Sequence, residues 1–181
     1  FIAAGAAVAS QEVNFVLVPE VPLRLDGPKG FLAALHRRMV DRHHAVVVVA
    51  EGAGQDLLAG ENGVDKSGNR KKADVGVFLR DRIQAYFKAK DTEVNLKYID
   101  PSYIIRSVPA NSQDARLCDA YARHAVHAAM AGKTDLIVGD WHGVFVHVPI
   151  PLAVASRKKI DIESDLWHAV IAATGQPQIW D

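Results

Sequence analysis

The sequence predicts an α/β protein built around an open, mostly parallel β-sheet. Short β-branched runs such as HAVVVVAEG (44–52) alternate along the chain with longer stretches in which apolar residues recur at helical spacing. Strands that alternate with helices in this way form βαβ units, in which neighbouring strands run parallel. The 181 residues are 49% hydrophobic and 23% charged, which is ordinary for a globular protein with its own core.

The N-terminal part of the chain begins this alternation. Residues 1–10 are small and apolar, and because they lack a basic region we interpret them as part of an Ala-rich helix and not as a signal peptide. The run NFVLVPE (14–20) is typical of a buried strand that ends at a proline. Residues 27–42 carry apolar side chains at helical spacing and predict a helix. The run at 44–52 predicts the second buried strand.

The middle of the chain continues with a loop, a helix and a strand. Residues 60–74 are polar and glycine-rich, so we predict a surface loop and expect it to be the most disordered part. Residues 74–90 have an apolar stripe and predict a helix. The run EVNLKYID (93–100) predicts the third strand, which stops where Asp100 meets Pro101.

The clearest helix of the C-terminal part is predicted at 112–132. Asn111 or Ser112 can cap its start, and Gly132 can end it. Two strands and a last helix follow, at residues 135–140, 143–150 and 163–175. The last helix has acidic residues in its first turn and Gly175 at its end, as helix boundaries require.

Charge, hydropathy and cysteine content exclude several classes of protein. Lys plus Arg and Asp plus Glu both number 21, so the net charge is zero and the basic surface of a nucleic-acid-binding protein is not expected. No apolar stretch is long enough to predict a membrane span. Cys118 is the only cysteine, which predicts a cytoplasmic protein without an intrachain disulfide. We expect Cys118 to be a packed, small apolar group.

Two carboxylates follow predicted strands. Glu51 comes directly after AVVVVA and before a Gly-Ala-Gly turn, at the strand end where open α/β sheets bind ligands. Such a carboxylate could accept hydrogen bonds from sugar hydroxyls, although a helix-capping or solvated acid fits the same pattern. Glu20 occupies a similar position in VPE, and there we favour a structural role.

Two cations and a phenol surround the break at Asp100-Pro101. Lys97 offers a point charge, Tyr103 a neutral donor and Arg106 a planar fork of donors. One phosphate could accept from all of them if the loop folds back on the strand. The alternative is an edge strand with solvated charges.

Other familiar kinds of site are missing from the sequence. The histidines, among them His124 and His127, lack a spaced set of carboxylate or cysteine partners, so we expect no metal site built on them. Neither a phosphate-binding loop of the Walker or G-x-G-x-x-G type nor a G-x-S-x-G nucleophile motif occurs.

The segments KYIDPSYIIRS, FIAAGAAVAS, NFVLVPE, VVVVAEGAGQD and AVHAAMAGKTD resemble the 6-phosphofructokinases. The chain looks most like the group with plant, trypanosomal and many bacterial enzymes, some of which use ATP and some pyrophosphate. The resemblance is collinear over almost the whole chain and implies a Rossmann-like three-layer fold. It also implies that residues 1–108 belong to the fructose 6-phosphate-binding domain and residues 109–181 return to the donor-binding domain.

The resemblance further implies a glycolytic kinase that transfers a phosphoryl group from ATP or pyrophosphate, with Mg²⁺, to the 1-hydroxyl of fructose 6-phosphate. Glu51 would accept hydrogen bonds from the sugar hydroxyls, while Tyr103 and Arg106 would hold the 6-phosphate within the subunit. Lys97 would serve a neighbouring subunit's site. The implied assembly is a homo-oligomer, dimeric or tetrameric, with substrate sites at its interfaces.

Some motifs of these enzymes are absent from this sequence. The glycine-rich donor loop, the catalytic aspartates and the Mg²⁺ ligands are expected upstream of Phe1, so no catalytic residue is assigned here and this segment alone should be inactive. Two alternatives remain. One is a catalytically inactive sugar-phosphate-binding or regulatory subunit, and the other is a different α/β module for sugar phosphates or nucleotides.

Overall fold

The computed structural model describes residues 1–58 and 73–181, which form two compact units. The first unit combines Phe1–Asp100 with Lys159–Asp181, and the second is Pro101–Lys158. Most of the loop predicted at 60–74 lies outside the described residues.

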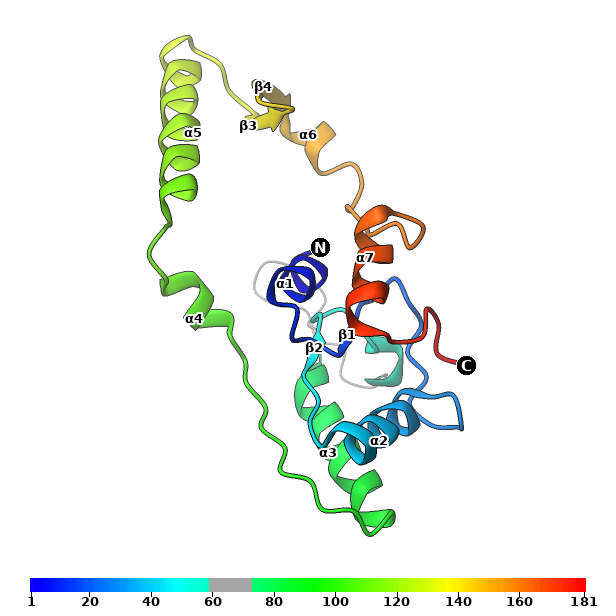
Figure 1. Ribbon diagram of the computed structural model, residues 1–181. Helices are drawn as coiled ribbons and strands as arrows, with labels where there is room; N and C mark the ends of the chain where they lie inside the picture. Colours follow the sequence, from blue (N-terminus) through cyan, green and yellow to red (C-terminus); the bar gives the residue numbers. More distant parts are fainter. Residues whose placement is uncertain (59–72) are drawn as a thin grey trace. The chain divides into compact units, whose positions relative to one another are not determined.

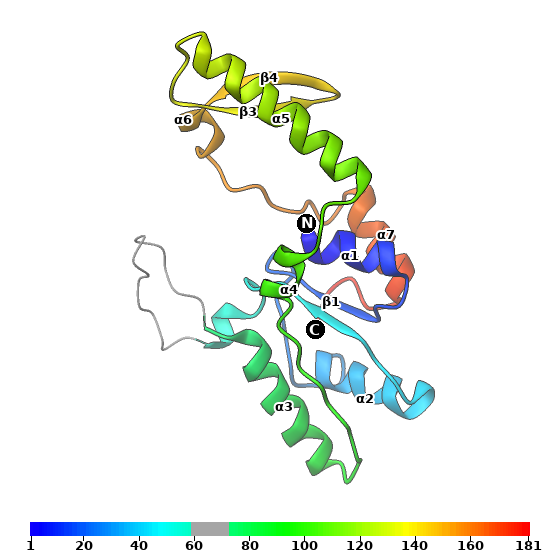
Figure 2. The same cartoon turned by 90° about the vertical axis from the view of Figure 1, so that its left-hand side faces the viewer.

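The first unit has three layers, with a parallel pair of strands between two pairs of helices (Figures 1 and 2). Its strands are β1 (Phe15–Leu17) and β2 (Val47–Val49), paired so that Phe15 lies opposite Val47. Helices α1 and α7 cover one face and α2 and α3 the other. The helix bounds are α1 Ile2–Ser10, α2 Phe31–Arg42, α3 Val75–Ala89 and α7 Asp165–Thr174, with a short 3₁₀ helix η1 at Gln55–Leu58.

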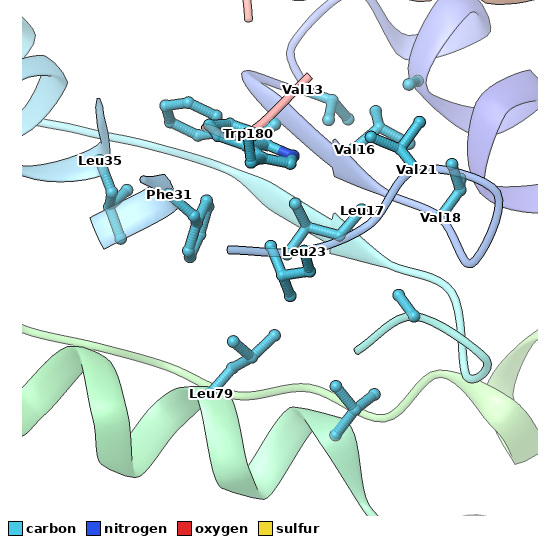
Figure 3. Close-up of a cluster of buried hydrophobic side chains, with 14 of the residues drawn as sticks. Val13, Val16, Leu17, Val18, Val21, Leu23, Phe31, Leu35, Leu79 and Trp180 are labelled. Carbon is cyan, nitrogen blue, oxygen red and sulfur yellow. The ribbon is translucent and has the colours of Figure 1, made fainter. Parts of the chain in front are cut away.

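Strand β1 is buried along its whole length, as its uninterrupted apolar run predicts for a strand covered on both faces. Figure 3 shows Phe31 of α2, Leu79 of α3 and Trp180 of the C-terminal tail entering the apolar cluster around this strand. Phe31 makes edge-to-face contacts with Phe15 and Trp180, each with ring centres 5.6 Å apart. The core of this unit therefore needs residues from both ends of the chain.

The Gln176 side chain occupies the edge of β1 opposite β2. In a parallel strand alternate residues bond to either side, and here Phe15 N and Leu17 O bond to the β2 side. Val16 faces the other way, where its N–H donates to Gln176 Oε1 (2.6 Å) and its carbonyl accepts from Gln176 Nε2 (3.2 Å). Gln176 is only 5% exposed, so its amide replaces a neighbouring strand at this buried edge.

The second unit is built on an antiparallel hairpin. Strands β3 (Leu136–Trp141) and β4 (Val144–Pro149) are joined by His142 and Gly143, both with positive φ, as a two-residue type I′ turn requires. Helix α5 (Ser112–Met130) packs its Tyr121 ring against Phe145 of β4. Two short helices complete the unit, α4 (Ser102–Ser107) and α6 (Ile150–Ala153).

The mixed α/β class and the predicted helices are confirmed. Asn111 caps α5 by accepting from Asp114 N (2.8 Å), and Gly175 ends α7 with φ of 66°. The described part of the chain contains one parallel and one antiparallel pair of strands. Residues 93–100 form no strand in the described part of the chain, so the strand predicted there is wrong. The alternating apolar residues of this segment pack without strand pairing, because Val94 and Leu96 lie half-buried against the core.

Cys118 is exposed, so the prediction of a packed side chain is wrong. It lies about one turn before Tyr121, the residue through which α5 contacts the hairpin. Helix α4 was not predicted from the sequence, and it begins directly after Pro101. None of the helices in the described ranges is long and apolar enough to cross a membrane.

Replacing Gln176 by leucine should destabilise the first unit. The substitution leaves the buried N–H and carbonyl of Val16 without partners, which should lower the free energy of unfolding by about 2–4 kcal/mol. Urea unfolding followed by tryptophan fluorescence measures the change. Gln178→Leu is the matched control, because Gln178 is exposed. Equal stability of the two variants would contradict the role given to Gln176.

Candidate functional site

Glu51 lies in the turn that follows β2, at the carboxyl end of the strand, and is exposed. The turn is held on both sides. Gly52 sits so close to Pro19 that an added Cβ would lie 3.3 Å from the proline ring, and Gln55 Nε2 donates to the Glu51 carbonyl (2.9 Å). The backbone of Glu51 is therefore fixed where parallel strands of an α/β sheet present side chains to ligands.

The Gln55 amide also connects this turn to the start of α3. Its Nε2 donates to the Ala73 carbonyl (3.0 Å), and its Oε1 accepts from Ala73 N (3.1 Å). One side chain thus joins the Glu51 turn to the residue just before the N-cap of α3.

Asp74 carries the connection onward. Its Oδ1 caps α3 by accepting from Val77 N (3.0 Å) and also accepts from the Tyr98 hydroxyl (3.1 Å). The Tyr98 ring lies directly over Gly76, where a methyl group would overlap the ring atoms. Glycine is required here because the ring approaches the helix backbone closely.

Lys97 is the residue next to this anchored tyrosine. It is exposed, while its neighbour Leu96 is half-buried against the core. The extended segment is therefore held by Leu96 and Tyr98, and the lysine between them projects to solvent. A continuous set of contacts runs from the Glu51 turn through Gln55 and Asp74 to the segment that carries Lys97.

The pKa of the Tyr98 phenol is raised above its ordinary value of 10.0. Burial is the largest cause, followed by the hydrogen bond to Asp74 and the negative charges of Asp74 and Asp100, while Arg80 opposes the shift. All of the causes that raise the pKa disfavour the phenolate. Tyr98 therefore remains a hydrogen-bond donor to Asp74 at neutral pH.

Tyr103 and Arg106 lie in the second unit, on α4. They are three residues apart, which places both side chains on one face of the helix, and both are exposed, Tyr103 by 85%. No carboxylate in the described residues forms an ion pair with Arg106. A phenol and a guanidinium one turn apart can both donate to one anion.

The four predicted residues thus fall into two pairs. Glu51 and Lys97 belong to the first unit, and Tyr103 and Arg106 to the second. That Glu51 accepts from the sugar hydroxyls, that Tyr103 and Arg106 hold the 6-phosphate, and that Lys97 serves a neighbouring subunit all stay predictions. Glu20 has the structural role that we favoured, because its Oε1 accepts from Ile160 N (3.0 Å).

Sequence reasoning missed the residues that position this site. Asp74, directly before an apolar-periodic stretch, is a recognisable N-cap signal, and Gly76 inside a helical pattern indicates a close approach. Gln55 gave no local signal, because its partner is 18 residues away. Across residues 1–58 and 73–181, His, Cys, Asp and Glu side chains form no group of three that could hold a metal ion.

Comparison with known proteins gives a consistent set of relatives. The chain is 46% identical over 184 residues to the ATP-dependent 6-phosphofructokinase of Borreliella burgdorferi, and 47% identical over 184 residues to that of Amycolatopsis methanolica. It is 42% identical over 177 residues to the chloroplastic ATP-dependent 6-phosphofructokinase 5 of Arabidopsis thaliana. Each match covers 98% of this chain but only 41%, 40% and 33% of the relative. No protein-family model matches the chain.

Removing the Asp74 carboxylate should lower the pKa of Tyr98 toward 10.0. Asp74→Ala abolishes both the hydrogen bond and the nearer negative charge, whereas Asp100→Asn removes a smaller cause and should lower the pKa less. Because the folded-state pKa is raised, the stabilisation from protonated Tyr98 is present below pH 10.0 and is lost as the pH rises through the raised value. Ultraviolet titration of the phenol measures both variants. A larger shift from Asp100→Asn would contradict this assignment.

Adding a methyl group at Gly76 should displace Tyr98 and loosen the Lys97 segment. Gly76→Ala is favourable for an isolated helix by about 0.8–1 kcal/mol, so any loss of order must come from the clash with the ring. We expect lower ¹H–¹⁵N heteronuclear NOE values for residues 95–99, which report motion of a segment whose amides donate no backbone hydrogen bond to the described residues. Gly5→Ala in α1 is the control, since nothing lies within 4 Å of its added Cβ. Unchanged NOE values in Gly76→Ala would exclude the anchoring role of Tyr98.

Proposed function

The chain is homologous to ATP-dependent 6-phosphofructokinases, and from this premise we propose that it forms part of a glycolytic kinase. The enzyme would transfer a phosphoryl group from ATP to the 1-hydroxyl of fructose 6-phosphate. The observation that carries the proposal is 46–47% identity to two such enzymes across 98% of the chain. The names of these relatives favour ATP over pyrophosphate as the donor.

We propose that this segment positions the acceptor sugar. Glu51 accepts hydrogen bonds from the sugar hydroxyls, and Tyr103 and Arg106 donate to the 6-phosphate. Their exposure and their spacing on α4 support this role. Phosphoryl transfer depends on positioning and on charge stabilisation, and orienting one reactant can lower the barrier by roughly 7–11 kcal/mol.

Lys97 has a different role in the proposal, because it would reach the 6-phosphate of a neighbouring subunit in a homo-oligomer, a dimer or tetramer. Lys97 is exposed, and its neighbour Tyr98 is hydrogen-bonded to Asp74. This position supports a role in which Lys97 contacts a ligand bound to another subunit. A cytoplasmic location is proposed from the single cysteine, although the Arabidopsis relative is named chloroplastic.

Residues 1–108 are proposed to belong to the sugar-phosphate domain and residues 109–181 to contribute to the donor-binding domain, although the compact units divide the chain elsewhere, with residues 159–181 in the first unit and 101–158 in the second. The burial of side chains in the second unit supports the view that it is completed by other parts of a larger domain. Ala128 alone is buried among its described side chains. Large apolar side chains such as Trp141 and Leu152 are 69% and 68% exposed. A surface of this kind is typical of a face that packs against more protein.

Magnesium with ATP is part of the proposed reaction. The residues of the described ranges do not fit a Mg²⁺ site, since no group of three acidic or other ligand side chains gathers there. No step is therefore assigned to a metal in this segment, whose own residues bind and orient the sugar phosphate.

Replacing Arg106 by alanine in the full-length enzyme should lower kcat/KM for fructose 6-phosphate by about 10²-fold or more. The loss corresponds to a charge-assisted hydrogen-bonded pair of roughly 2–3 kcal/mol. Steady-state kinetics with varied sugar phosphate measure it. Arg123→Ala is the control, because Arg123 is an exposed arginine on α5 that pairs with Asp119 (2.9 Å). Unchanged kcat/KM in Arg106→Ala would refute the proposed contact between Arg106 and the 6-phosphate.

A further inference from the structure

The first unit contains a hollow of about 420 Å³ beside α2 and α3, and none of the residues assigned to the sugar phosphate lines it. The loop before α2 and both helices contribute to its wall. The lining residues that matter are Gly27 and Pro28 of the loop, His36 and Arg37 of α2, Tyr86 of α3, and Lys90, which caps the C-terminal end of α3. Its volume falls within the range of roughly 300–1,000 Å³ that small-molecule sites occupy.

The charge of this hollow is uncompensated. Arg37 and Lys90 line it together with His36, and no carboxylate does. Within the part of the chain that the structure describes, neither cation forms an ion pair, whereas the nearby Asp26 is engaged by Arg82 (2.8 Å). Two cations that line one recess without a carboxylate beside them raise the local concentration of anions.

Each of the two cations has a contact with another residue that lines the hollow. Arg37 Nη1 donates to the Pro28 carbonyl (3.0 Å), which holds the guanidinium against the loop and leaves its other N–H groups available. Lys90 Nζ lies 5.8 Å from the centre of the Tyr86 ring, a cation–π contact that steadies the ammonium group. The ring of His36 stands edge-on to Tyr86 at 6.2 Å and its Nε2 meets Thr92 Oγ1 at 3.2 Å.

We propose that this hollow binds the phosphate group of a small phosphorylated molecule. The planar fork of Arg37 suits two phosphate oxygens, and Lys90 supplies a point charge from the other helix. The Tyr86 ring offers an apolar surface for the remainder of the ligand. This proposal uses none of the residues assigned to the sugar phosphate and does not depend on their role.

The test uses inorganic phosphate as the probe. Titration calorimetry is performed on the full-length protein carrying Arg106→Gln, which removes the guanidinium from the proposed sugar-phosphate site and so weakens phosphate binding there. Adding Arg37→Gln and Lys90→Gln together should weaken phosphate binding by about 10-fold or more, because two charged donors are lost. Lys88→Gln, which removes an exposed charge on the same helix but outside the hollow, should change the affinity less than about 2-fold.

The outcomes separate the two proposals. Equal phosphate affinity with and without Arg37 and Lys90, or no phosphate binding in the Arg106→Gln protein, overturns the site beside α2 and α3. If Arg106→Ala leaves kcat/KM for fructose 6-phosphate unchanged, the proposed sugar-phosphate site is overturned. That result has no bearing on the phosphate site beside α2 and α3. Both Arg37 and Lys90 are exposed, so melting temperatures of the variants should match the parent and identify any misfolded protein.

Discussion

The two hydrogen bonds between Gln176 and Val16 are the constraint on which the first unit depends. Strand β1 is buried on both faces, and β2 satisfies only one of its edges. The other edge must be satisfied by polar groups from elsewhere, and the chain supplies them 160 residues later. Trp180 enters the same core, so the C-terminal tail is an integral part of the β1 environment.

Polar contacts, more than apolar packing, determine where the candidate residues of this unit lie. Gln55 bonds the Glu51 turn to Ala73, and Asp74 bonds the start of α3 to Tyr98. Each of these side chains satisfies backbone or hydroxyl groups that an irregular segment leaves open. Gln55 and Asp74, to which no ligand contact is assigned, thereby fix the backbone that carries Glu51 and Lys97.

Sequence patterns predicted the local features and missed the long-range ones. Caps such as Asn111 and Gly175 are encoded within a few residues, so the helix ends were predictable. The segment around Lys97 alternates like a strand, but alternation reports which side chains are buried and not whether the backbone is paired. The contact of Gln55 with Ala73 depends on the tertiary fold and has no signature in the sequence.

The distance along the chain between β1 and Gln176 has a consequence for synthesis on the ribosome. At about 5–20 residues per second, the stretch from Asp100 to Gln176 takes roughly 4–15 s to emerge. Throughout that interval the nascent β1 would have an open edge and an incomplete apolar cover. Such an edge can pair with foreign strands, so this stage of elongation is the one at which chaperones would matter most.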